Sequence, residues 1–187
     1  MNIKEAKASL RKQCLDMLKA QTPDERRQRS EFIINKLLEL EKLERISVVM
    51  VYVSDLHEVE THTLIEKLLQ GGKRVVIPYL DESKDIIPCE INDLKRDTEM
   101  SWYGYLEPKQ ELHQKPLDLD ELELVLVPGI AFDTKGNRLG RGWGCYDRFL
   151  SKLPVEIPTV GLAFDFQILP TIPTEENDIT VSSVLSN

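Results

Sequence analysis

The feature that most constrains the fold is a pair of short, almost wholly apolar segments with a helical segment between them. Residues 46–53 form a β-branched run, which is typical of a strand covered on both faces. Residues 61–70 then place leucine and isoleucine at helical spacing, and a glycine pair ends the helix. Residues 75–77 form a second apolar run, which Pro78 ends. Strand, helix and strand within about thirty residues predict a right-handed βαβ unit in a parallel sheet.

The rest of the chain extends this α/β pattern. Two helices are predicted in the first forty residues, the second starting at Thr22-Pro23, where threonine can cap the helix and proline fits its first position. Residues 81–121 are less regular and predict a short strand or two plus loops. The sequence therefore predicts one α/β domain, residues 1–187, with a mostly parallel sheet on which the two N-terminal helices pack. Further elements are predicted at residues 122–127 (strand), 146–153 (helix), 159–164 (strand) and 179–185 (strand).

Composition narrows the functional classes. The 187 residues are 41% hydrophobic and carry a formal net charge of −8, which is ordinary for a globular protein and argues against broad binding to nucleic acid or an anionic membrane. No apolar run approaches the roughly 20 residues of a membrane span, and the N-terminus has no apolar signal core. Three widely spaced cysteines fit neither a disulfide framework nor a zinc knuckle. We therefore expect a cytoplasmic protein.

The strongest functional pattern lies in residues 127–148. It begins at the carboxyl end of a predicted buried strand, where open α/β sheets place their ligand crevices. Alternating glycines let the backbone approach a ligand closely, and a helix predicted to begin near residues 144–147 favours anions at its amino end. Two arginines add planar donors suited to phosphate oxygens. The pattern, which points to a polyphosphate, consists of Arg138, Gly140, Arg141, Gly142 and Gly144.

Each of these features has an ordinary structural alternative. The glycine pattern is not a P-loop, because no Gly-Lys-Ser/Thr follows, and it is not the dinucleotide fingerprint, because Cys145 stands where the third glycine belongs. It can therefore also be a turn with solvated arginines. Asp147 can bind Mg²⁺ beside phosphates or simply stabilise the start of a helix. Lys7 and Arg11, four residues apart, share one helix face that either reaches a phosphate site or faces solvent.

The same residues carry a family resemblance. Residues 128–147, which read Pro-Gly-Ile-Ala-Phe-Asp-Thr-Lys-Gly-Asn-Arg-Leu-Gly-Arg-Gly-Trp-Gly-Cys-Tyr-Asp, resemble the signature of the 5-formyltetrahydrofolate cyclo-ligases, also called 5,10-methenyltetrahydrofolate synthetases. Four shorter segments resemble further family motifs in the expected order, so that the similarity covers nearly the whole chain. The resemblance implies a three-layer α/β fold like that of ribose-phosphate isomerases and CoA transferases. The shorter segments are 7–11, 58–61, 106–108 and 176–178.

The resemblance implies an ATP- and Mg²⁺-dependent ring closure. It would convert 5-formyltetrahydrofolate to 5,10-methenyltetrahydrofolate and release ADP and phosphate. The γ-phosphoryl group is transferred to the formyl oxygen, N10 of the folate attacks the activated carbon, and phosphate departs without a covalent protein intermediate. The protein positions the two substrates and neutralises charge on the phosphoryl group. The expected partner is the folate alone, with no nucleic acid or membrane, in a monomer or homodimer.

Site residues are carried over by the same resemblance. Lys7, Arg138 and Arg141 are expected to be catalytic, by neutralising charge on the phosphoryl group. Asp147 and Asp178 are expected to hold Mg²⁺. Folate contacts are expected from Glu60, Arg141, Trp143 and Cys145, although Glu60 can equally be a surface acid near a helix cap. The residues expected to contact ATP are Lys7, Arg11, Arg138, Gly140, Arg141, Gly142, Trp143, Gly144, Cys145 and Tyr146.

Two departures from the family pattern keep other functions open. Trp143 stands where many relatives have a basic residue, and Cys145 replaces one member of a tyrosine pair. A regulatory module that binds a nucleotide or phosphosugar without turnover is therefore one alternative, and a sugar-phosphate isomerase is another. Trp102, Tyr103 and Tyr105 can line a folate pocket, although a satellite core cluster is the favoured interpretation.

Overall fold

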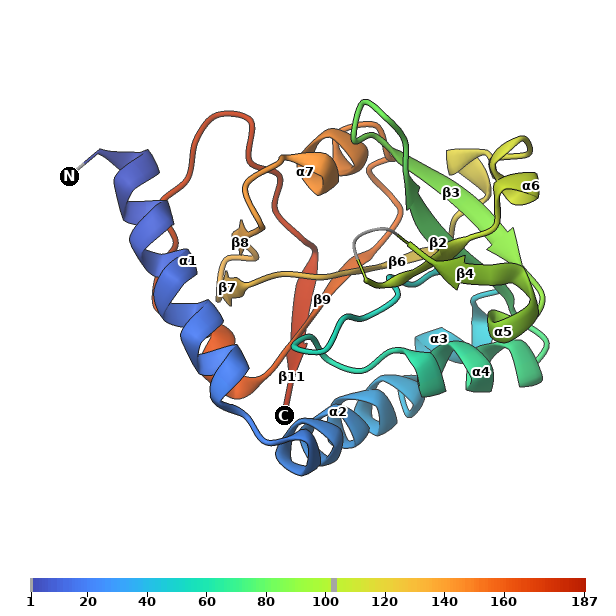
Figure 1. Ribbon diagram of the computed structural model, residues 1–187, viewed down its shortest axis with the longest axis horizontal. Helices are drawn as coiled ribbons and strands as arrows, with labels where there is room; N and C mark the ends of the chain where they lie inside the picture. Colours follow the sequence, from blue (N-terminus) through green and yellow to red (C-terminus); the bar gives the residue numbers. More distant parts are fainter. Residues whose placement is uncertain (1, 102–103) are drawn as a thin grey trace.

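A computed structural model describes residues 2–101 and 104–187 of the chain, so that Trp102 and Tyr103 lie outside the described residues. Its centre is a six-stranded sheet in the order β11-β9-β6-β1-β2-β3, in which neighbouring strands are parallel except for the antiparallel pair β2 and β3 (Figure 1). The strands are β1 (Val48–Met50), β2 (Arg74–Leu80), β3 (Ile86–Ile91), β6 (Leu124–Val127), β9 (Thr159–Ala163) and β11 (Ser183–Ser186).

The βαβ unit predicted from the sequence is confirmed. Strand β1 leads through helix α4 (His62–Gln70) to β2, and the two strands pair in parallel with Val49 opposite Val75. Side chains of β1 alternate between two cores: Val49 packs in the core that holds α4 and α2 (Pro23–Leu38), and Met50 packs in the core that holds α7 (Cys145–Leu150). Helices therefore cover both faces of the sheet, as expected for a three-layer α/β fold (Figure 1).

Helix α1 (Ile3–Ala20) packs mainly on a second, three-stranded sheet in the order β10-β7-β8. Cys14 of α1 lies in one apolar cluster with Ala131 and Leu139, whereas Leu18 near its end reaches the central core. The prediction that both N-terminal helices pack on the central sheet therefore holds for α2 and only for the end of α1. The strands of the small sheet are β7 (Ala131–Asp133), β8 (Arg138–Leu139) and β10 (Ile168–Leu169).

Several element boundaries differ from those predicted, and the largest differences are in β1, β2 and β11. Only residues 48–50 of the apolar run 46–53 are strand. Strand β2 continues through Pro78 to Leu80. Its pairing with β1 ends at Met50, so from there on β2 pairs with β3 alone. One side of β2 is then an edge, where proline's missing amide donor breaks no hydrogen bond of the sheet. The last strand is Ser183–Ser186 rather than 179–185.

Short elements fill the less regular regions. They are α3 (Glu41–Arg45), α5 (Leu94–Asp97), β4 (Thr98–Met100), β5 (Leu106–Pro108), α6 (Gln110–His113) and the 3-10 turns η1 (Leu119–Glu121) and η2 (Asp165–Gln167). Short strands were predicted in this region, whereas the helical elements α3, α5, α6, η1 and η2 were not. All three cysteines are free thiols, in agreement with the absence of a disulfide framework.

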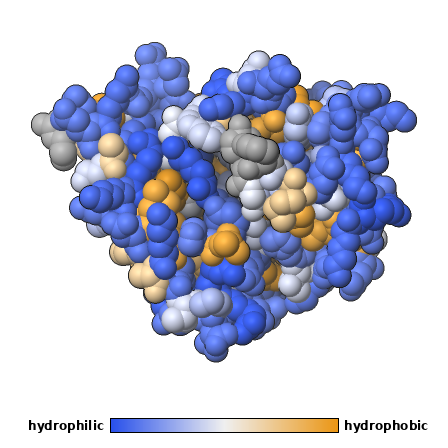
Figure 2. All heavy atoms as spheres, in the orientation of Figure 1, coloured by the Kyte–Doolittle hydropathy of each residue, from blue (hydrophilic) through white to orange (hydrophobic). Residues whose placement is uncertain are grey.

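No helix in the described part of the chain is both long and apolar enough to span a membrane. Hydrophilic side chains cover most of the face shown in Figure 2, and the hydrophobic side chains on it form small, separate patches.

Candidate active site

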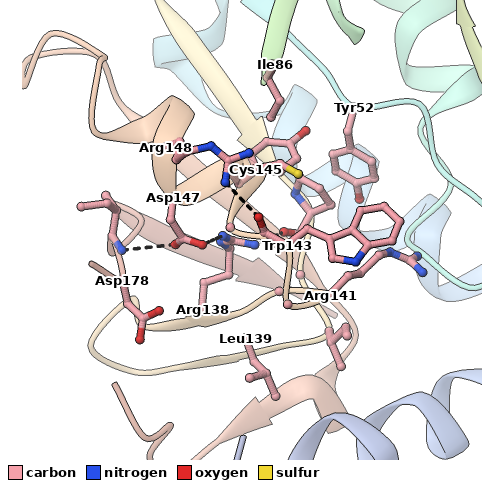
Figure 3. Close-up of a pocket in the computed structure, with 18 of the residues that line it drawn as sticks. Tyr52, Ile86, Arg138, Leu139, Arg141, Trp143, Cys145, Asp147, Arg148 and Asp178 are labelled. Carbon is pink, nitrogen blue, oxygen red and sulfur yellow. Dashed lines mark hydrogen bonds and ion pairs between the residues drawn. The ribbon is translucent and has the colours of Figure 1, made fainter. Parts of the chain in front are cut away.

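A cavity of about 850 Å³ opens at the carboxyl ends of the parallel strands. The chain enters its wall directly after β1, through Tyr52 and Val53, and directly after β6, through Pro128. The opposite wall comes from α1 and from the C-terminal segment 175–179, and the segment 138–148 runs between the two (Figure 3). This is the edge at which open α/β sheets place their ligands.

Arg138 is a buried cation of this cavity, with 8% of its surface exposed. Its guanidinium donates to a carboxylate oxygen of Asp147 at 3.0 Å and lies 5.5 Å from the centre of the Tyr146 ring. A Cβ atom at Gly140 would stand 2.6 Å from one guanidinium nitrogen, so only glycine lets the backbone pass this close. The alternative of solvated arginines in a glycine-rich turn therefore does not describe Arg138.

Helix α1 contributes two further cations from one face, as the spacing of four residues predicted. Lys7 is only 4% exposed and binds Asp178 at 2.5 Å and Glu175 at 3.0 Å. Burial by itself lowers the pKa of Lys7, but the two carboxylates outweigh that effect and raise the pKa. Arg11 donates through Nε to the carbonyl oxygen of Gly140 at 2.8 Å. The solvated alternative is wrong for Lys7, because α1 packs against the C-terminal segment.

Arg141 lies on the other side of the cavity and is about half exposed. Its guanidinium bridges Asp55 and Glu58, at 3.1 Å from the nearer oxygen of Glu58. Burial and the neighbouring Asp55 raise the pKa of Glu58, and the charge of Arg141 partly opposes this shift. An acidic pair and an arginine thus neutralise one another at this end of the cavity.

Asp147 and Asp178 both line the cavity, on the same side of Arg138 in Figure 3. Asp147 accepts hydrogen bonds from Arg138 and, at 3.3 Å, from the backbone N–H of Ile179, which follows Asp178. In the described chain no group of three or more His, Cys, Asp or Glu side chains is arranged to hold a metal. Two carboxylates that share a cavity with four cations suit Mg²⁺ arriving with phosphate oxygens, since that ion usually takes one or two protein carboxylates.

Trp143 is half exposed and lines the cavity near Arg141 (Figure 3). The ammonium of Lys84, at the tip of the β2–β3 hairpin, lies 3.9 Å from the centre of its indole. Arg148 ties the same two segments together, because it donates to the carbonyl oxygens of Trp143 and Lys84 and binds the carboxylate of Asp85 at 2.8 Å. The β2–β3 hairpin therefore holds the glycine segment in place. This contact between two segments far apart in the sequence was not predicted.

Glu60 is not among the cavity-lining residues that the structure describes. Its carboxylate binds Arg26 of α2 at 2.5 Å, and its backbone N–H donates to the hydroxyl of Ser30. Glu58, two residues earlier in the same motif, is the acid that reaches the cavity, while the folate contact expected of Glu60 stays a prediction. The other residues expected at the site, including Trp143, Gly144, Cys145 and Tyr146, all line the cavity.

Sequence reasoning missed Asp55, Tyr52 and Arg148. Tyr52 and Asp55 lie in the segment that follows β1, and the rule that ligands bind at the carboxyl ends of parallel strands would have singled out this segment. Arg148 offered no comparable signal, because its partners come from a hairpin more than sixty residues away in the chain.

Fold and cavity together define a class of protein. It is a three-layer α/β protein whose parallel strands end at a cavity lined by paired cations and carboxylates, with a glycine-rich segment lying across it. Comparison with known proteins shows which family of this class the chain belongs to.

The sequence profile of the 5-formyltetrahydrofolate cyclo-ligase family matches residues 3–187. The 5-formyltetrahydrofolate cyclo-ligase of Mus musculus is 30% identical over 99% of this chain and 95% of its own length, and that of Haemophilus influenzae is 37% identical over 73% and 74%. The solved structure of the Aquifex aeolicus 5,10-methenyltetrahydrofolate synthetase superposes with a TM-score of 0.83 at 28% identity, over 96% of this chain and 88% of that one. The chain therefore belongs to the 5-formyltetrahydrofolate cyclo-ligase family, and it is an enzyme of that family.

Proposed function

We propose that this enzyme uses ATP and Mg²⁺ to convert 5-formyltetrahydrofolate to 5,10-methenyltetrahydrofolate, with release of ADP and phosphate. The observation that carries the proposal is the convergence of four cations on one cavity, beside the two carboxylates expected to hold a metal. These cations come from α1 and from the glycine segment; they are Lys7, Arg11, Arg138 and Arg141.

The nucleotide phosphates are assigned to the end of the cavity between α1 and the C-terminal segment. Lys7 and Arg138 are held there by Asp178 and Asp147, so both cations are already positioned before any ligand arrives. If a magnesium–triphosphate complex binds there, Lys7 and Arg138 would exchange their carboxylate partners for phosphate oxygens, and Asp147 and Asp178 would hold the metal. This exchange keeps every charge paired, which avoids the large free-energy penalty of an isolated buried charge.

Mg²⁺ would be held by Asp147 and Asp178. When bound there, it would supply positive charge that neutralises the phosphoryl group. The residues of the chain hold this group in place: Arg138 is fixed from behind by the carbonyl of Pro128, and Arg11 fixes the backbone at Gly140.

The folate is assigned to the opposite end, near Tyr52, Glu58 and Trp143. A carboxylate can accept two N–H donors of a pterin ring side by side, and Glu58 is the acid of its motif that faces the cavity. Glu60 supports it by tying the same segment to α2 through Arg26. Trp143 and Cys145 line the cavity between Arg141 and α7, where the indole offers a flat face to a planar ring.

The chemistry needs no protein nucleophile. The formyl oxygen attacks the γ-phosphorus, ADP departs, and the formyl carbon becomes an electrophile bearing a phosphate leaving group. N10 then forms a bond to that carbon, the carbon–oxygen bond breaks with its electrons staying on the phosphate oxygen, and the N10 proton passes to the released phosphate. Lys7, Arg138 and Arg141 serve by stabilising charge on the phosphoryl group as it moves.

One experiment tests the proposal directly. The protein is mixed with MgATP and 5-formyltetrahydrofolate, and the ultraviolet band of methenyltetrahydrofolate is followed, with release of ADP measured in parallel. We expect the band and ADP to appear in equal amounts and only when ATP and Mg²⁺ are both present. ATP binding without the band would favour a regulatory module, and turnover of a sugar phosphate would favour an isomerase.

A further inference from the structure

Two buried polar atoms of the described side chains have no hydrogen-bond partner, and both belong to the same cavity. They are Nε of Arg138 and the hydroxyl of Tyr146. An unpaired buried donor destabilises the folded protein, so such groups are rare. Since every other buried side-chain polar atom in the described residues is satisfied, the two exceptions point to atoms that a ligand supplies.

The Tyr146 ring is held firmly in place. It packs edge-on against Phe149, with ring centres 6.4 Å apart at 79°, and the guanidinium of Arg138 lies 5.5 Å from its centre on another side. The ring therefore directs its hydroxyl at one place in the cavity. A phenol carries its proton at neutral pH, so this hydroxyl is available as a hydrogen-bond donor.

The nearest acidic group does not serve as the acceptor. Glu58 interacts electrostatically with Tyr146, but its carboxylate accepts hydrogen bonds from Arg141 and from the backbone N–H of Asp55. A donor that has a carboxylate in its vicinity and is still unpaired is aimed at a different acceptor.

Tyr146 also stands between the two ends of the cavity. Glu58 belongs to the end assigned to the pterin, while Arg138 is bound to Asp147, at the end assigned to the phosphates. Figure 3 shows the same division, with Asp147 and Asp178 on one side of Arg138 and Tyr52, Trp143 and Arg141 on the other. The atom that joins the two substrates during the proposed reaction is the formyl oxygen.

We propose that the Tyr146 hydroxyl donates a hydrogen bond to the formyl oxygen of the folate, the atom that receives the phosphoryl group. This inference rests on the proposed function. A carbonyl oxygen has two lone pairs, so one can accept the bond from Tyr146 while the other faces phosphorus. The bond orients the formyl group for phosphoryl transfer and later stabilises negative charge on this oxygen as its bond to carbon breaks.

The test compares wild-type protein with Tyr146→Phe, which keeps the ring and removes only the hydroxyl. We expect kcat to fall about 10- to 100-fold, while the Kd of MgATP, measured without folate, changes less than about twofold. Tyr79→Phe is the matched control, because Tyr79 stacks on His113 outside the cavity, and its kcat should equal that of the wild type. A Tyr146→Phe variant with wild-type kcat would overturn the proposal, as would a loss of MgATP affinity as large as the loss of kcat.

A second readout does not depend on turnover. Without ligands, Tyr146→Phe should melt at the same temperature as the wild type or higher, because it removes an unpaired buried group. The rise in Tm on adding 5-formyltetrahydrofolate should be smaller in the variant, whereas the rise on adding MgATP alone should be unchanged. Equal folate-induced rises in both proteins would overturn the assignment. If the wild type forms no methenyltetrahydrofolate, the proposed function fails, and these Tm values still decide what the hydroxyl binds.

Discussion

At the scale of single residues, the site shows cations that are already paired before a ligand arrives. Lys7, Arg138 and Arg141 each bind one or two carboxylates at the cavity. Such pairs are rigid and keep the cations at fixed positions, and this preorganisation lowers the reorganisation needed when charge develops on a phosphoryl group. Exchange of partners, rather than capture of an anion by free lysines and arginines, is therefore the binding mode that these residues favour.

Arg141→Ala should lower kcat/KM by about 10²-fold or more, because it removes a donor to the transferring phosphoryl group. The measurement is steady-state formation of methenyltetrahydrofolate under saturating Mg²⁺. Arg74→Ala is the control, since Arg74 is an exposed arginine with two carboxylate partners, Glu90 and Glu121, away from the cavity. Unchanged turnover in Arg141→Ala would remove Arg141 from the reaction.

Asp147→Asn should shift the Mg²⁺ titration of activity to higher metal concentration, because an amide oxygen binds a hard dication more weakly than a carboxylate. Asp16→Asn, on the exposed side of α1, should leave the titration unaltered. If Asp147→Asn titrates as the wild type does, its carboxylate serves only to hold Arg138 and the N–H of Ile179.

At the scale of elements, the β7–β8 hairpin connects the glycine segment to the C-terminal segment. Its turn is ordered by Asp133, which accepts from the backbone N–H groups of Lys135 and Asn137 and, across the fold, of Ile172. At the tip, Gly136 adopts a left-handed conformation with φ of 81°, and its carbonyl accepts from the N–H of Val181 at 2.9 Å. The turn thereby positions the segment that carries Asp178.

Gly136→Ala should destabilise the protein by more than Gly72→Ala. Both glycines have positive φ, so alanine at either position costs about 1–2 kcal/mol in the left-handed region. A Cβ at Gly136 would also collide with the carbonyl oxygen of Val181, whereas a Cβ at Gly72 meets no heavy atom within 4 Å. The free energy of unfolding from urea titration measures the difference. If both variants lose the same free energy of unfolding, the hairpin accommodates the added Cβ without strain.

At the scale of the whole molecule, a net charge of −8 surrounds a cavity that is expected to bind an anionic nucleotide. The long-range field therefore does not assist binding, and affinity must come from cations within the cavity and from the accompanying Mg²⁺. Helix α1 supplies two of those cations from the start of the chain, and the C-terminal segment supplies the carboxylate that holds one of them. Ligand binding should accordingly stabilise the fold as a unit.

MgATP at 100 times its Kd should stabilise the folded state by about 2.7 kcal/mol, which raises Tm by roughly 5–10 °C for a chain of this length. AMP, which lacks the outer phosphates, should have little effect. Lys7→Ala should lose most of the MgATP-induced rise, and Lys12→Ala, an exposed lysine on the same helix, should keep it. Differential scanning fluorimetry measures both variants. A full rise in Lys7→Ala would place the phosphates elsewhere.

The local sequence determined the elements that have strong periodicity and clear end signals. The capped helix after Thr22, the β1–α4–β2 unit and the glycine segment were all predicted because their causes lie within a few residues. The hairpin at Gly136 was missed although its Asp-Thr-Lys-Gly-Asn turn is a local signal, since its strands have only two or three residues. The sequence also singled out the four cations that line the cavity, Lys7, Arg11, Arg138 and Arg141, although their contact with phosphates stays a prediction.

Tertiary structure alone decided the pairings across the cavity. Periodicity shows that Lys7 lies on a helix face, but only the fold brings it to Asp178, which is 171 residues away. The same holds for Arg141 with Glu58, and for the choice between Glu58 and Glu60, which depends on how one loop is tied to α2. The physical reason is that periodicity arises from backbone geometry within one element, whereas ion pairing and burial depend on which elements meet.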